Sequence, residues 1–137
     1  MGAEPPGLTP AQQRAFQAAE KRAASYAQDP NRVARLLADA EHKAEAHSGR
    51  LALIWKDLHA LFRLIHAWFS GDYRVVPWKA ILWALAAVIY FVNPFDLIPD
   101  LIPFAGFPDD ATMIGFVIRA IRSDLDKFLA WENTPSS

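Results

Sequence analysis

Prolines and aspartates interrupt the most apolar part of this chain at close intervals. Residues 93–110 hold four prolines and four aspartates, and the tetrapeptide Asp-Leu-Ile-Pro occurs there twice in tandem, at 96–99 and 100–103. Because proline lacks an amide donor, prolines at this density prevent a continuous helix. Because isolated carboxylates are costly in apolar surroundings, the aspartates need hydrogen bonds, cations or metal ions as partners. The segment must therefore form a specific, tightly turned connection.

Capping is the simplest role for these aspartates. A carboxylate accepts hydrogen bonds from the backbone amides that follow it, and a glycine supplies backbone angles that other residues avoid. We therefore predict a structural hinge between an apolar helix and a C-terminal amphipathic helix. The predicted hinge residues are Asn93, Pro94, Asp96, Pro99, Asp100, Pro103, Gly106, Asp109 and Asp110.

The rest of the chain shows helical patterns. Thr9-Pro10 and Asp29-Pro30 each place a capping residue before a proline, which is typical of a helix start. The first helix has a weak apolar face, whereas the third has a wide apolar stripe and the fourth is apolar nearly all round. The expected helices span about residues 10–28, 30–47, 50–69, 77–92 and 109–131. No strand pattern competes, so we predict an all-α fold, a small bundle of about five helices.

Length and composition limit the domain count and the partners. The 137 residues suit one domain, and we expect a flexible N-terminus (1–8), a single helical domain (9–132) and a flexible tail (133–137). A net charge of −1 lacks the basic footprint of a nucleic-acid-binding protein. The absence of cysteine excludes disulfides and thiolate chemistry. The first residues have neither a basic region nor an apolar core of a secretory signal, which predicts residence in, or facing, the cytoplasm.

The proline-aspartate signature resembles that of the YkvA-like family, a bacterial domain of unknown function. The resemblance begins with Tyr90-Phe91-Val92-Asn93-Pro94 and continues through both Asp-Leu-Ile-Pro repeats to Gly106 and Asp109-Asp110. It covers about residues 76–122, and nothing equally specific marks residues 1–70. The resemblance implies a small helical protein that is commonly membrane-associated, and it brings no catalytic residues with it.

The apolar stretch before the hinge leaves three placements open. Residues 80–92 are thirteen uncharged and apolar positions, which is short of the roughly 20 that a membrane span requires. A buried core helix, an interfacial or re-entrant segment, and a span all remain as alternatives. Tryptophans suit both a membrane interface and an aromatic core. The candidate contacts with a membrane or partner are Trp78, Ile81, Trp83, Leu85, Phe95, Phe104 and Phe107.

The same aspartates offer an alternative metal site. Asp96, Asp100, Asp109 and Asp110 carry the hard oxygen ligands that Ca²⁺, Mg²⁺ or Mn²⁺ prefer, although capping explains all four without an ion. The histidines are spaced five or seven residues apart rather than four, so we interpret them as polar surface residues. No nucleophile elbow, phosphate loop or zinc spacing is present, and the enzyme hypothesis has no positive support.

These patterns together favour a non-enzymatic, membrane-associated helical adaptor or scaffold. We expect it on the cytoplasmic side of the inner membrane, peripheral or partly inserted, with a membrane surface or a membrane protein as its partner. One alternative is a divalent-metal-binding regulator or metal-dependent enzyme that uses the aspartate cluster. Another is a soluble, cytoplasmic, homodimeric interaction protein.

Overall fold

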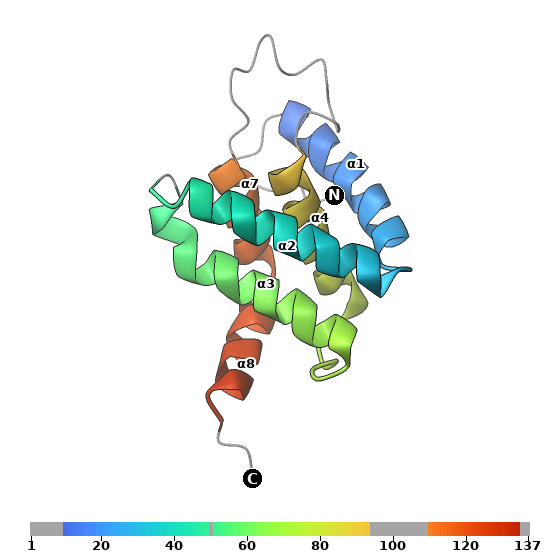
Figure 1. Cartoon of the computed structure of the whole chain (residues 1–137), viewed down its shortest axis with the longest axis vertical. Coiled ribbons are helices and arrows are strands. Elements are labelled where there is room, and N and C mark those ends of the chain that lie inside the picture. Colours follow the sequence, from blue (N-terminus) through green and yellow to red (C-terminus); the bar gives the residue numbers. More distant parts are fainter. Residues whose placement is uncertain (1–9, 50, 94–109, 135–137) are drawn as a thin grey trace.

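A computed structural model describes residues 10–49, 51–93 and 110–134 (Figure 1). These residues form six α-helices, one short 3-10 helix and no strand, so the predicted all-α bundle is confirmed. The elements are α1 (Pro10–Tyr26), α2 (Pro30–Ala46), η1 (Ala52–Ile54), α3 (Trp55–Ser70), α4 (Trp78–Val92), α7 (Asp110–Ala120) and α8 (Arg122–Glu132).

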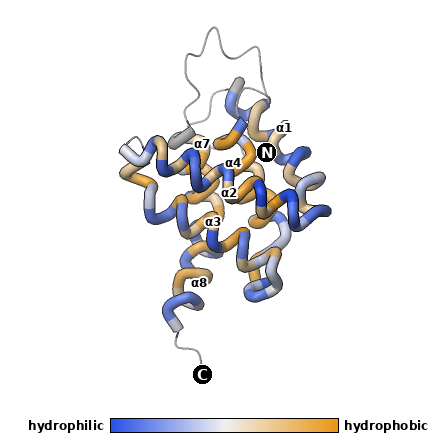
Figure 2. Tube along the Cα trace, viewed as in Figure 1, coloured by the Kyte–Doolittle hydropathy of each residue, from blue (hydrophilic) through white to orange (hydrophobic). Residues whose placement is uncertain are grey.

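Helix α4 lies at the centre of the bundle. It contacts α1, α2, α3 and α7, and ten of its fifteen residues are buried. Its apolar character on all sides is explained by neighbours on several sides at once. The tubes of α2 and α3 alternate between hydrophilic and hydrophobic positions in Figure 2, as expected for helices that cover a core with one face only. No helix among the described residues is long and apolar enough to cross a membrane.

The interface between α1 and α4 is built on small residues. Ala15, Ala19 and Ala23 are fully buried on α1, and their spacing of four places them on one face of the helix. Phe16 completes this face, with its ring centroid 5.2 Å from that of Trp83 in an edge-to-face arrangement. Helix α1 therefore packs through a stripe of alanines. Because alanines are small, the apolar face of α1 looks weak in the sequence.

Sequence signals for helix ends agree with the structure at two places. Asp29 Oδ1 accepts a hydrogen bond from the amide of Asn31 at 3.1 Å, and Pro30 occupies the first turn of α2. At the other end of the core, α4 ends at Val92, and the amide of Asn93 donates to the carbonyl of Ile89 at 2.9 Å. Both boundaries follow from the cap-proline and Asn-Pro pairs in the sequence.

The predicted last helix is wrong in one respect, because the structure divides it into α7 and α8. Ile121 leaves helical geometry with φ −110° and ψ 20°. Helix α7 contacts both α4 and α3, whereas α8 contacts α3. The break at Ile121 separates the helix that packs on α4 from the helix that packs on α3.

An arginine clamp holds the start of α8 on α3. Arg122 Nη2 donates to Asp57 Oδ2 at 2.8 Å and Nη1 donates to Asp57 Oδ1 at 3.3 Å. Arg122 Nη1 also pairs with Asp126 Oδ1 at 3.2 Å within α8. The hydrogen bonds with Asp57 raise the pKa of the Arg122 guanidinium above its ordinary value. Arg122 therefore makes a tertiary contact between α8 and α3.

We expect Ala19→Leu to destabilise the bundle. The added branch has to fit into a fully buried site between α1 and the core, and such overpacking costs about 1–3 kcal/mol in free energy of unfolding. Urea unfolding followed by circular dichroism measures this change. Ala24→Leu, at an exposed position on the same helix, is the matched control. Equal stability of both variants would contradict close packing of α1.

Candidate functional site

Two of the four exposed large hydrophobic residues in the described part of the chain lie at the turn between α3 and α4. Val75 is 77% exposed and Trp78 is 43% exposed. Trp68 and Phe69 lie beside them and are half-buried, with 5.5 Å between the ring centroids of Trp68 and Trp78. We call this surface the aromatic corner, and its members are Trp68, Phe69, Val75 and Trp78 together with the basic residues Arg74 and Lys79.

Hydrogen bonds hold the aromatic corner in one conformation. Gly71 ends α3 with φ 90°, a left-handed angle that favours glycine. Arg74 Nε donates to the carbonyl of Trp68 at 2.7 Å, and its guanidinium lies 4.5 Å from the centroid of the Trp68 ring. Trp68 Nε1 donates to the carbonyl of Val76 at 3.4 Å. Val75 is thus exposed on a braced turn.

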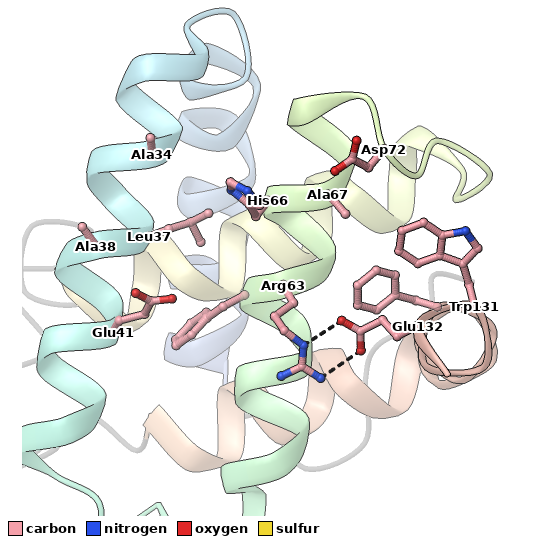
Figure 3. A pocket seen from close by; sticks show the side chains of 12 residues that line it. Ala34, Leu37, Ala38, Glu41, Arg63, His66, Ala67, Asp72, Trp131 and Glu132 are labelled. Carbon is pink, nitrogen blue, oxygen red and sulfur yellow. Dashed lines mark hydrogen bonds and ion pairs between the residues drawn. The ribbon is translucent and has the colours of Figure 1, made fainter. Parts of the chain in front are cut away.

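A groove crosses the outer side of α3, between α2 and α8 (Figure 3). It encloses about 590 Å³. Leu37, Phe62 and Phe128 form its apolar floor, while the exposed Ala34 and Ala38 form one wall. We call it the acidic groove, because three carboxylates lie around it. Its remaining lining residues are Glu41, Arg63, His66, Ala67, Asp72, Trp131 and Glu132.

Charges in the acidic groove do not balance. Arg63 makes a two-point ion pair with Glu132, with Nε to Oε2 at 2.8 Å and Nη2 to Oε1 at 3.0 Å (Figure 3). The hydrogen bond to Glu132 raises the pKa of the Arg63 guanidinium, so this residue stays charged. Glu41 and Asp72 make no ion pair within the described part of the chain. The groove therefore carries an excess of two negative charges when His66 is neutral.

Tyr73 joins the two surfaces. It is 6% exposed, and its ring centroid lies 4.9 Å from that of Trp131 and 5.2 Å from that of Phe128. Burial, and secondarily the nearby charge of Asp124, raise the pKa of the Tyr73 phenol above its usual 10.0. Both causes disfavour the phenolate.

The residues expected to contact a membrane or partner occupy different environments. Trp78 is exposed, while Ile81 and Leu85 are fully buried in the core. Trp83 is half-buried, and its Nε1 donates to Glu20 Oε2 at 3.3 Å. Phe95, Phe104 and Phe107 lie outside the described residues. Trp78 is therefore the described member of this set that offers the most surface.

Most of the predicted hinge also lies outside the described residues. Asn93 caps the end of α4, and Asp110 is the first residue of α7. Within the described ranges, no group of three or more histidines and acids could hold a metal ion. The other hinge positions outside these ranges are Pro94, Asp96, Pro99, Asp100, Pro103, Gly106 and Asp109.

Periodicity within single helices does not predict the acidic groove. Its lining comes from α2, α3 and α8, and the placement of α8 depends on the break at Ile121. One signal in the sequence is the pair Ala34 and Ala38, which are small residues on the outer side of an amphipathic helix. For the aromatic corner, the signal is the apolar run Val75-Val76-Pro77-Trp78 directly after a charged turn.

Comparisons with known proteins agree with the signature around the hinge. Residues 80–116 match a family described as a protein of unknown function (DUF1232). A relative, the uncharacterized membrane protein YkvA of Bacillus subtilis (strain 168), is 37% identical over 70 residues. The chain is similar to YkvA over this stretch. The match covers 51% of this chain and 66% of the relative, and no solved structure matches.

We expect Tyr73 to make the stability of this helical bundle sensitive to alkali. Since its pKa is raised in the folded state, its contribution is complete below the unfolded value of about 10 and is lost as the pH rises through the folded value. Melting temperatures between pH 8 and pH 11.5, roughly the range that brackets tyrosine ionisation, measure the loss. Tyr73→Phe should flatten this decline. If the control Tyr26→Phe flattens it equally, Tyr73 is not the cause.

Proposed function

We propose that the chain is a non-enzymatic adaptor that docks peripherally on the cytoplasmic face of a membrane through the aromatic corner. The observation that carries this proposal is the exposure of Val75 and Trp78 on a braced turn. An apolar residue that is 77% exposed at the tip of an ordered turn is available for burial elsewhere. A peripheral protein would bury it among lipid headgroups and the first carbons of the chains.

The composition of the aromatic corner fits a membrane interface. Tryptophan rings favour the headgroup level because they are amphipathic. Arg74 and Lys79 are both exposed at the corner, and each basic side chain near an anionic leaflet contributes about 1 kcal/mol to binding. The acidic Asp72 lies at the same turn and offsets part of this attraction. The matched relative, which is described as a membrane protein, supports the same class of function.

Docking through the aromatic corner leaves the core intact. Ile81 and Leu85 contribute to the centre of the bundle, so their exposure to lipid would require α4 to separate from its neighbours. Val75 and Trp78 need no such opening. Of the candidate contacts among the described residues, Trp78 therefore carries the proposal, together with Val75 and Arg74.

We expect binding to vesicles that contain phosphatidylglycerol, and weaker binding to vesicles of phosphatidylcholine alone. Val75→Asp combined with Trp78→Ser should abolish co-flotation, because it removes the exposed apolar area. Arg74→Gln combined with Lys79→Gln should weaken binding roughly tenfold or more, at about 1 kcal/mol for each charge. Vesicle flotation of the purified full chain measures both effects.

Leu53→Asp is the matched control. Leu53 is 101% exposed in η1, directly before α3, whereas the aromatic corner lies at the C-terminal end of α3 and the turn that follows it. This control should float like the unaltered protein. If it loses flotation while the Val75 variant retains it, a different surface docks. Alkaline carbonate should release the protein from cell membranes, and retention in the pellet would contradict peripheral docking.

A further inference from the structure

We propose that the acidic groove binds a basic amphipathic helix of a partner protein. This inference deepens the proposed adaptor function and rests on it for the setting, because an adaptor needs a partner site besides its membrane surface. The binding step itself needs no membrane. Shape and charge of the groove carry the proposal independently of the aromatic corner.

The shape of the groove suits a helix as its ligand. Ala34 and Ala38 are one turn apart on the exposed side of α2, and small side chains permit close approach of a second helix. Trp131, which is 44% exposed, borders the opposite side on α8 (Figure 3). Phe62 and Phe128 beneath them are each at most 2% exposed, while the exposed side chains of Arg63 and His66 on α3 line the space between the two walls. A ligand would therefore contact Arg63 and His66 as well as the two walls, without opening the core.

Charge complementarity selects a basic ligand. Glu41 reaches the groove from α2 and Asp72 from the turn after α3, on different sides of His66 (Figure 3). Neither carboxylate has an ion-pair partner in the described part of the chain. Lysines or arginines along one helix would meet both, while an acidic helix would be repelled. Glu132 offers a third site, already shared with Arg63.

The position of the groove beside the aromatic corner suits a segment close to a membrane surface. Asp72 precedes Tyr73, whose ring contacts Trp131 of the groove, and Arg74 of the corner follows directly. A partner helix in the groove would thus lie near the docking turn. Basic amphipathic segments themselves favour membrane surfaces. A partner segment of this kind would therefore be present where the aromatic corner docks on the membrane.

Binding can be tested in solution with a synthetic probe. The probe is a fluorescent amphipathic helix of leucine and lysine, about 15 residues long, the length at which isolated helices become marginally stable. A peptide of identical pattern with glutamate in place of lysine is its control. Fluorescence anisotropy with the full chain should show binding of the lysine peptide alone, and this binding should weaken with salt.

Substitutions on the groove identify the site. Ala38→Met fills the groove from an exposed helical position and should weaken binding about tenfold, equivalent to 1.4 kcal/mol. Glu41→Gln combined with Asp72→Asn should cause a loss of similar size. Ala24→Leu and Asp39→Asn make matched changes at exposed positions outside the groove and should leave binding unchanged. Circular dichroism confirms that each variant is folded.

Nuclear magnetic resonance gives a second readout that does not depend on any variant. The lysine peptide should shift the amide signals of Ala34 and His66 and the indole signal of Trp131. The proposal is overturned if neither peptide binds, if the glutamate peptide binds equally well, or if the shifts fall elsewhere. Val75→Asp should bind the peptide normally, so loss of membrane docking and loss of peptide binding are distinguished.

Discussion

The burial of α4 is the constraint on which the rest of the structure depends. A helix that is apolar on nearly every side must be covered on nearly every side, and α1, α2, α3 and α7 supply that cover. Its C-terminal end is also bound, since the Lys43 ammonium on α2 donates a hydrogen bond to the carbonyl of Phe91. The amphipathic helices need only one apolar face each because α4 provides the common surface. Their outer faces remain available for charges, alanines and the groove.

Sequence patterns predict the helical elements of this bundle better than their contacts. Periodicity and cap-proline pairs indicate α2 and α4 closely, because their determinants are local hydrogen bonds and side-chain spacing. The break at Ile121 has no proline or glycine at its position to announce it, and it lies where the contact with α4 made by α7 is not continued by α8. The sequence does not indicate that α1 is buried through its alanines. Alanine has little apolar area, and only a close neighbouring helix makes it a core residue.

The two candidate surfaces differ in how far they can be predicted from the sequence. Trp78 stands out in the sequence as an aromatic residue at the start of an apolar helix, and it is exposed in the structure. The acidic groove depends on three helices meeting at one place, so no single stretch of sequence contains it. Both surfaces lie on described residues outside residues 80–116, which match the family of unknown function. The segment that matches the family is therefore separate from the surfaces proposed to interact.

The ion pairs between α8 and α3 bear on whether α8 is ordered. Its first residue is Arg122 and its last is Glu132, with no basic residue in the last turn, so both terminal charges oppose the helix dipole. Helix α3 places Asp57 beside the first end, in addition to Asp124 in the first turn of α8, and Arg63 beside the second end, where α8 has no basic residue of its own. With only eleven residues, α8 is too short to persist alone in water. The order of α8 therefore depends on the surface of α3 beneath it.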